Sequence, residues 1–530
     1  MKWDYIVVGA GSAGCALIHE LTSQGKSVLA LEAGGSDASP FIKIPAAIWH
    51  MGSRFDWGYR AQPDLSRGGI VESWRCGRVI GGTSCINGMV YVRGAPEDFD
   101  RWSQKCAGQG RWNASDVTPI FEGLESSDNC SPYRGHRGGL FVRTVRRPHI
   151  LSHAFVESAC NAGSTYNDDY NGRTQHGVSY MQFSQRAGLR WTAADAFLKP
   201  HLKRENLRLL TNVCVERLDI SAGHVRSVRF RHGTKQLQEH SHHVVLCAGA
   251  INSPKLLMLS GIGNSCDLDR IGIQVTQHTP AVGMNLLEHP YAQLNYRMRI
   301  PSYNLTEGFH QKFAIGLQYL MRREGPLAAV YEAAAFLKMS PESTAPDFQV
   351  LFAPIGWSGE IAGEGLEGRL KLSQYPAVKI LVLRSHTASS GRVRLASSNP
   401  ASQPIIEYEA LSDLSDVNAL VKGVTMVRQI MQTPPMKDLV DVEMAPGPLV
   451  DSPESLAYYL RDHTELACHP SGTCRMGLGP DSVVGPDLRV HGIENLWIAD
   501  ASIMPDAISA NLNAPCMMIG SKLGRQLLER

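Results

Sequence analysis

The sequence predicts an α/β fold, and three observations carry that prediction. Residues 4–32 have the pattern strand, glycine-rich turn, helix, strand. Apolar runs typical of buried strands recur at residues 243–248 and 496–499. Residues 290–464 lack the pattern seen at residues 4–32. They contain alternating polar and apolar stretches, as at 378–383 and 392–395. Alternation of this kind is typical of an antiparallel sheet with one solvated face.

Composition and charge exclude several classes of protein. Of the 530 residues, 43% are hydrophobic and 19% are charged, which is typical of a globular protein and not of a disordered one. The net charge of +2 provides no basic surface for nucleic acid or an anionic membrane. We find no apolar run of about 18 residues or more, so we expect no transmembrane helix.

The cysteines indicate a reducing compartment. All 12 are scattered along the chain, and no Cys-x-x-Cys pair occurs. That is far from the density of a disulfide scaffold. The first residues lead directly into the strand at 5–8 and show no signal-peptide pattern. We therefore expect free thiols in a cytoplasmic protein.

The first strand leads directly into a dinucleotide-binding fingerprint. In residues 9–14, Gly9 permits the tight turn, Gly11 lets a pyrophosphate approach the backbone, and Gly14 lets the helix pack against the strand. The helix N-terminus then faces the phosphates. Glu32 ends the second strand 18 residues beyond Gly14, where a carboxylate can accept hydrogen bonds from a ribose.

Later motifs resemble a known family. Residues 77–88 form a second glycine-rich stretch, which alone could be a surface loop that binds no phosphate. Together with Tyr91, Gly94 and Asp100, however, this stretch resembles the first signature of the glucose–methanol–choline (GMC) oxidoreductases. Residues 249–263 resemble the second signature at every defined position. Residues 469–477 and 499–502 complete the set, so the resemblance extends over essentially the whole chain.

The resemblance implies a fold and a reaction. It implies a discontinuous Rossmann-like FAD-binding domain, built from residues 1–155, 200–289 and 465–530. An α+β substrate domain with an antiparallel sheet would comprise residues 156–199 and 290–464. It further implies oxidation of an alcohol, most simply a primary alcohol to its aldehyde, with hydride transfer to flavin N5. The electrons would pass to O2 or to a quinone-type acceptor.

The same resemblance implies which residues bind the cofactor. They come from the fingerprint, the second glycine-rich stretch, two middle strands and the C-terminal segment. We expect FAD contacts from Gly9, Gly11, Ser12, Ala13, Gly14, Glu32, Ala33, Trp57, Arg78, Gly82, Ser84, Asn87, Gly88, Met89, Val90, Val215, Ala248, Gly249, Asp500, Ala501, Asn513 and Ala514. Asn513 and Ala514 would also start a helix whose positive end suits an anionic flavin.

The resemblance also assigns a catalytic pair. His469 falls on the position of the base that takes the hydroxyl proton, and histidine suits that role because it titrates near neutrality. Asn511 falls on the second position, which is histidine or asparagine in the family. An amide can hold the substrate oxygen by hydrogen bonding but exchanges no protons usefully, so His469 would be the sole base.

Three further expectations concern the cofactor link, the pocket and metals. Some family members attach FAD to a histidine where this chain has Ile86, so we expect non-covalent FAD. The resemblance places Glu332 near the substrate cavity, facing a quaternary ammonium in choline-oxidising members. The His240–His243 cluster lacks a second pair of ligands at a finger-like spacing. Cys468, His469 and Cys474 could also suggest zinc, but the GMC resemblance explains His469 better, so we expect no metal.

Two other classes of function remain as alternatives. A non-redox flavoprotein such as a lyase also occurs on this fold, and a flavin-stabilised binding protein would need no catalysis. Because His469 and Asn511 are both present, the sequence favours the alcohol oxidoreductase.

Overall fold

A five-stranded parallel sheet forms one half of the molecule. The computed structural model describes residues 3–51, 53–304, 316–317, 319–358 and 371–529. The strand order is β10 (Leu207–Leu210), β2 (Val28–Leu31), β1 (Trp3–Val8), β14 (Ser241–Leu246) and β27 (Leu496–Ile498). Every pairing in this order is parallel. The expected apolar runs therefore come together in one sheet although they are hundreds of residues apart in sequence.

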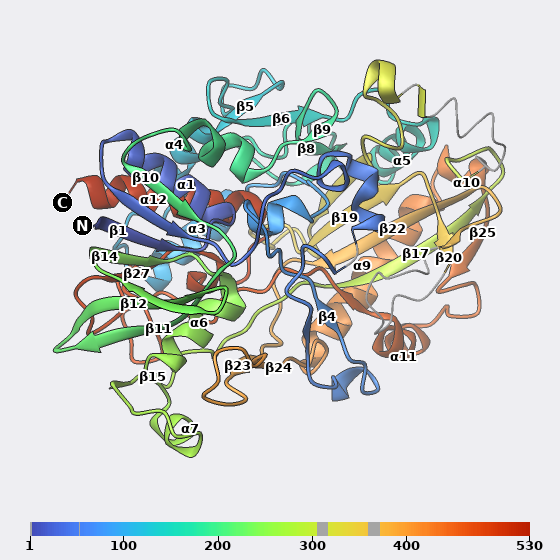
Figure 1. Cartoon of the computed structure of the whole chain (residues 1–530). Helices are drawn as coiled ribbons and strands as arrows, with labels where there is room; N and C mark the ends of the chain where they lie inside the picture. Colours follow the sequence, from blue (N-terminus) through green and yellow to red (C-terminus); the bar gives the residue numbers. More distant parts are fainter. Residues whose placement is uncertain (1–2, 52, 305–315, 318, 359–370, 530) are drawn as a thin grey trace.

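Two helices from opposite ends of the chain pack together on this sheet. Helix α1 (Ser12–Ser23) lies beside α12 (Asn513–Leu528), and the two termini of the chain lie on the same side of the molecule (Figure 1). Gly520 makes the close approach possible, because a Cβ there would lie 2.1 Å from the carbonyl oxygen of Ala13. The Ser12 hydroxyl also donates to Asn513 Oδ1 over 2.7 Å, so both helices begin at the same place.

An antiparallel sheet forms the other half. Its order is β25 (Val440–Ala445), β17 (Pro290–Met298), β22 (Ala377–Arg384), β19 (Phe348–Ala353), β18 (Ala333–Leu337) and β7 (Gly177–Tyr180). Helices α5 (Ile150–Asn161) and α9 (Leu414–Met431) cover one face. Phe155 of α5 stacks on Phe352 with ring centroids 4.6 Å apart. The alternating stretch at 378–383 therefore belongs to a sheet covered by helices, as the GMC resemblance implies.

The chain passes between the two halves beside two histidines. Strand β26 (Glu465–Leu466) pairs with the first residues of β17. His289 directly precedes β17, and His469 follows β26 by three residues. Residue 465, which the sequence placed at the start of the last cofactor-binding piece, is thus hydrogen-bonded into the antiparallel sheet. The domain boundaries stay predictions.

The cysteines and the helices can be compared with the expectations of free thiols and of no transmembrane helix. All 12 cysteines are free thiols. Among the helices of the described ranges, none has the length and apolar character needed to cross a bilayer.

We predict that Gly520→Ala destabilises the cofactor-binding half. The added methyl group would collide with the α1 backbone, and overpacking of this kind costs about 1–3 kcal/mol of unfolding free energy. The measurements are the midpoint of thermal unfolding and the FAD content. Gly123→Ala is the matched control, because Gly123 is also helical but its added Cβ would meet only the flexible end of Arg525. Equal stability of the two variants would contradict this reading of the α1–α12 contact.

Candidate active site

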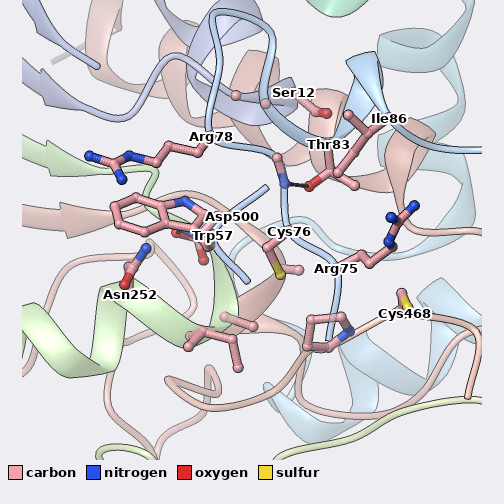
Figure 2. A pocket seen from close by; sticks show the side chains of 18 of the residues that line it. Ser12, Trp57, Arg75, Cys76, Arg78, Thr83, Ile86, Asn252, Cys468 and Asp500 are labelled. Carbon is pink, nitrogen blue, oxygen red and sulfur yellow. Dashed lines mark hydrogen bonds between the residues drawn. The ribbon is translucent and has the colours of Figure 1, made fainter. Parts of the chain in front are cut away.

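A cavity of about 790 Å³ lies between the two sheets. Val8 and Leu31, at the carboxyl ends of β1 and β2, line it from one side, and Leu351 and Leu381 of the antiparallel sheet line it from the other. Open α/β sheets bind their ligands at the carboxyl ends of strands. Figure 2 shows Trp57, Arg78 and Asn252 at one end of the cavity, and Arg75, Ile86 and Cys468 toward the other.

The turn after β1 is built for close contact with a phosphate. Gly9 has a φ of +101°, and a Cβ there would lie 2.4 Å from the carbonyl oxygen of Cys247. Helix α1 then begins at Ser12 without a side-chain cap on its first turn. Its free N–H groups and positive dipole end therefore face the cavity, where an anion would satisfy them.

Two buried carboxylates, Glu32 and Asp500, hold loops in place beside the cavity. Glu32 accepts hydrogen bonds from the N–H groups of Ala10 (2.8 Å) and Gly34 (2.7 Å). Asp500 accepts from the N–H groups of Gly249 and Ser502, each over 2.9 Å. Burial raises the pKa of both carboxyls, and these hydrogen bonds oppose the rise. Both residues also line the cavity, as expected for cofactor contacts.

An aromatic surface lines the end of the cavity where Trp57 and Arg78 lie. The Trp57 ring is stacked against Tyr59 at 5.9 Å between centroids, and the Arg78 guanidinium lies 4.8 Å from the Trp57 centroid. Val215 of β11 (Val213–Ser221) lines the same cavity. Flat aromatic and guanidinium groups of this kind suit a purine base.

Most of the expected cofactor residues line the cavity. They are Gly9, Gly11, Ser12, Ala13, Glu32, Ala33, Trp57, Arg78, Gly82, Asn87, Gly88, Met89, Val90, Val215, Ala248, Gly249, Asp500, Ala501 and Asn513. Gly14, Ser84 and Ala514 lie behind this lining. Gly14 packs on the Gly9 carbonyl, where a Cβ would be 2.0 Å from the oxygen, and the Ser84 hydroxyl donates to the Gly81 carbonyl. These residues shape the loops and helix starts that the lining residues share.

The two expected catalytic residues meet at the wall of the cavity. Asn511 Nδ2 lies 3.2 Å from His469 Nε2. The Asn511 Oδ1 atom accepts a hydrogen bond from Gln349 Nε2 over 2.9 Å. On the other side of the ring, His469 Nδ1 lies 3.0 Å from Nδ1 of His289. His469 is therefore held at both ring nitrogens, by one residue from each half of the molecule.

The backbone of His469 is anchored by a buried carboxyl group. The His469 N–H donates to both oxygens of Glu288, over 2.8 and 2.6 Å, and the His289 N–H donates to the same group over 2.7 Å. Burial raises the pKa of Glu288 to about 8, against the effect of these N–H donors. Burial, with a smaller contribution from His289, holds the pKa of His469 well below its usual value. His469 is therefore neutral at pH 7 and able to accept a proton.

Glu332 lies beside the cavity lining and not in it. The cavity is lined by its neighbours Val330 and Tyr331 but not by Glu332. Its carboxylate accepts from the His149 N–H (2.7 Å), the Ser152 hydroxyl (2.7 Å) and the Tyr303 hydroxyl (2.9 Å). The carboxylate thus lies at the start of α5, where negative charge is favoured. A role for Glu332 in the substrate pocket stays a prediction.

Three contributors to the site, Glu288, His289 and Gln349, escaped the sequence analysis. His289 follows Glu288 in a stretch with no nucleotide-binding signal. Gln349 stands alone as a polar residue in the apolar strand Phe348–Ala353, and it is only 3% exposed. A buried amide in an apolar strand needs a hydrogen-bond partner, and that was the available signal. The partner itself depends on tertiary structure.

The candidate metal sites have other structural explanations. His240 faces the Arg226 carbonyl, and the His243 ring packs against Trp497 and Tyr5. Across the described ranges, no group of three or more His, Cys, Asp or Glu side chains is placed to hold a metal ion.

The fold and the site together define a dinucleotide-dependent oxidoreductase with a histidine–asparagine pair. Comparison with known families places it further. The GMC oxidoreductase model matches residues 3–291 in its N-terminal part and 387–520 in its C-terminal part. The chain belongs to the GMC oxidoreductase family. This confirms the FAD-dependent alcohol oxidoreductase class expected from the motifs.

Similar proteins extend over the whole chain. Oxygen-dependent choline dehydrogenases from Rhizobium johnstonii and Sinorhizobium fredii are each 38% identical to this chain and cover 100% of it and 97% of their own length. Pyridoxine 4-oxidase from Mesorbium loti is 28% identical, with a TM-score of 0.90 and full coverage of both chains. Formate oxidase from Aspergillus oryzae has the same TM-score at 23% identity, which supports the fold alone.

We predict that His469→Ala retains FAD but reduces it slowly. Loss of a positioned general base costs about 10²-fold or more in rate. The measurement is the rate of anaerobic flavin bleaching by alcohol. In the unsubstituted enzyme the same rate should be constant above pH 6.5, the ordinary histidine value, and fall only below it, because protonated His469 accepts no proton. An unchanged rate in His469→Ala would assign the base to another residue.

Proposed function

We propose that this protein oxidises a neutral primary alcohol with an apolar body to its aldehyde, using non-covalent FAD. The observation that carries the proposal is the His469–Asn511 pair, which lines the cavity next to an apolar wall. Bound FAD supplies the acceptor for the hydride of the alcohol carbon, and the electrons pass on to O2 or a quinone-type molecule. The free cysteines fit the cytoplasm as its location.

The protein's own residues handle the hydroxyl group. His469 Nε2 accepts the hydroxyl proton, because His469 is neutral and faces the cavity. Asn511 Nδ2 donates a hydrogen bond to the oxygen as its negative charge develops. Donation to a charged oxygen is worth more than donation to a neutral one, so Asn511 favours the alkoxide over the alcohol. Glu288 keeps the His469 backbone in place during the transfer.

The apolar wall supports a neutral substrate. The register of the antiparallel sheet places Leu383 opposite Gln349, and Leu381 opposite Leu351, so these leucines extend from the Asn511 contact along the cavity. Val330 and Leu466 add to the same lining. Apolar surface of this kind stabilises an aliphatic or aromatic body by about 25 cal/mol per Å² buried.

The charged groups in the lining do not favour a cationic substrate. Arg75 lines the cavity beside Cys468 and adds positive charge. The lining carboxylates among the described residues, Glu32, Glu216 and Asp500, belong to the fingerprint, β11 and the C-terminal segment, at the cofactor side. A quaternary ammonium would have no carboxylate of its own in the described lining near the catalytic pair.

Choline remains the second candidate, and specific residues favour it. Tyr291 and Tyr331 line the cavity, and aromatic faces attract quaternary ammonium groups. The Tyr291 hydroxyl donates over 2.5 Å to Glu465, a carboxylate outside the lining. Lys379, which is only 2% exposed, interacts electrostatically with the same carboxylate and offsets its charge. We therefore rank the neutral alcohol first.

We predict that 3,3-dimethylbutan-1-ol is oxidised with a higher kcat/KM than choline. The two alcohols have nearly the same shape and differ in the charge of the quaternary centre, so the ratio isolates charge. The measurement is the concentration dependence of anaerobic flavin bleaching by each alcohol. A ratio in favour of choline would show that Tyr291, Tyr331 and Glu465 act as a cation site.

Several groups in the lining support non-covalent FAD. Ile86 occupies the attachment position, and an aliphatic side chain cannot form the bond. The thiols of Cys76 and Cys468 also line the cavity, and burial raises the pKa of Cys468 to about 12 and that of Cys76 well above its usual value. A protonated thiol is a poor nucleophile.

We predict that acid precipitation releases all of the yellow colour into the supernatant. The fluorescence of the supernatant measures the released flavin, and the absorbance of the redissolved pellet measures the retained flavin. Flavin in the pellet would contradict the non-covalent proposal. The same preparation separates the functional classes, since a lyase or a binding protein would keep its flavin oxidised when any alcohol is added without oxygen.

A further inference from the structure

A line of four side chains runs through the catalytic pair, with both of its ends at the antiparallel sheet. Gln349 Nε2 faces Asn511 Oδ1, Asn511 Nδ2 faces His469 Nε2, and His469 Nδ1 faces His289 Nδ1. Each contact joins one donor and one acceptor. The direction of any one hydrogen bond therefore fixes the directions of all the others.

At the His289 end, the direction follows from the rest of the line. Asn511 Nδ2 can only donate, so a neutral His469 accepts at Nε2 and carries its proton on Nδ1. His469 Nδ1 then donates to Nδ1 of a neutral His289. Burial lowers the pKa of His289 to about 4, so it is neutral at pH 7.

The direction at the other end depends on which way the Asn511 amide lies. An unprotonated His469 Nε2 requires the N–H of Asn511, so Asn511 Oδ1 must find a donor elsewhere. Gln349 Nε2 is that donor. Gln349 is 3% exposed and belongs to β19, whose pairing with β18 and β22 fixes its place in the sheet.

We propose that Gln349 is a positioning residue for the reaction: its amide N–H holds Asn511 Oδ1, so that the Asn511 nitrogen faces the substrate oxygen and His469 Nε2, and Nε2 stays unprotonated and able to accept the proton. This inference rests on the proposed function of the His469–Asn511 pair. It adds that the antiparallel sheet determines the orientation of an amide that belongs to the C-terminal segment.

Reversal of the Asn511 amide would disable the site in two ways. The Oδ1 atom would face His469 and favour the tautomer with a proton on Nε2, which cannot act as the base. The same oxygen would face the developing alkoxide and repel it. Loss of the Gln349 donor removes the preference between the two orientations, whereas an acceptor at position 349 selects the wrong one.

The test compares Gln349→Glu with Gln349→Met, which has a similar length and no hydrogen-bonding N–H. Gln349→Met should lower the limiting rate of flavin reduction by about 2- to 10-fold, the effect of one neutral hydrogen bond, and keep the wild-type pH profile. Gln349→Glu should resemble it at low pH, where a protonated carboxyl can donate. As pH rises and the carboxyl ionises, Gln349→Glu should become slower by about tenfold or more.

The pH dependence of Gln349→Glu distinguishes positioning from packing. The titratable groups along this line of side chains and next to it, His469, His289, Glu288, His386 and Asp98, are present in every variant. An alkaline decline confined to Gln349→Glu therefore reports the new carboxyl. Identical pH profiles for Gln349→Glu and Gln349→Met would overturn the proposal. FAD content and the midpoint of thermal unfolding are measured for both variants.

A rescue variant separates hydrogen-bond direction from simple negative charge. In Gln349→Glu/Asn511→His, an imidazole N–H can donate to the carboxylate, and histidine occupies this position in other family members. The alkaline decline should shrink relative to Asn511→His alone. A decline of the same size in the double variant would mean that charge, and not direction, slows the reaction.

A double-mutant cycle keeps the proposal testable if Gln349→Glu does not fold. If Gln349 acts only through Asn511, Gln349→Met should slow the wild type but have no further effect in Asn511→Ala. Additive effects would contradict the proposal. If no alcohol bleaches the wild-type flavin, the proposed function fails, whereas normal wild-type bleaching with additive variants refutes only the role of Gln349.

Discussion

The active site depends on residues that two separate sheets bring together, although the strands of the two sheets alternate along the chain. His469 lies between Asn511 of the C-terminal segment and His289 at the start of β17, while Gln349 of β19 holds Asn511 from the opposite side. None of these residues can be placed without both sheets. The cavity between the sheets therefore has its reactive groups where the two halves meet, which allows one half to bind the cofactor and the other to surround the substrate.

The cofactor-binding half must let an anionic pyrophosphate come close to the backbone. Gly9 lets the β1–α1 turn lie against the Cys247 carbonyl, and Gly520 lets α12 lie against the backbone of α1. Helices α1 and α12 both begin without side-chain caps, and the Ser12–Asn513 hydrogen bond keeps their first turns together. Two positive helix ends thus meet at the cavity, where the phosphates and an anionic flavin ring would neutralise them.

Local sequence predicts the parts of this site that depend on the backbone. The glycine fingerprint, Glu32, His469 and Asn511 all lie in motifs whose spacing is fixed by a turn or a helix start. Gln349 and His289 were missed because the antiparallel sheet is assembled from strands whose register has no short-range signal. The surroundings of Glu332 could not be predicted from local sequence either. The sequence indicates a buried carboxylate, but only the structure shows that it turns toward α5 while Tyr331 faces the cavity.

The central claim is that His469 carries its proton on Nδ1 and keeps Nε2 free, in a line of hydrogen bonds that runs from His289 to Gln349. A neutron crystal structure of the oxidised, FAD-bound enzyme at pH 7 would locate these protons directly. The account predicts deuterium on Nδ1 of His469, none on Nε2, and the Asn511 amide with its nitrogen toward His469. Deuterium on His469 Nε2, with the oxygen of Asn511 facing it, would contradict the account.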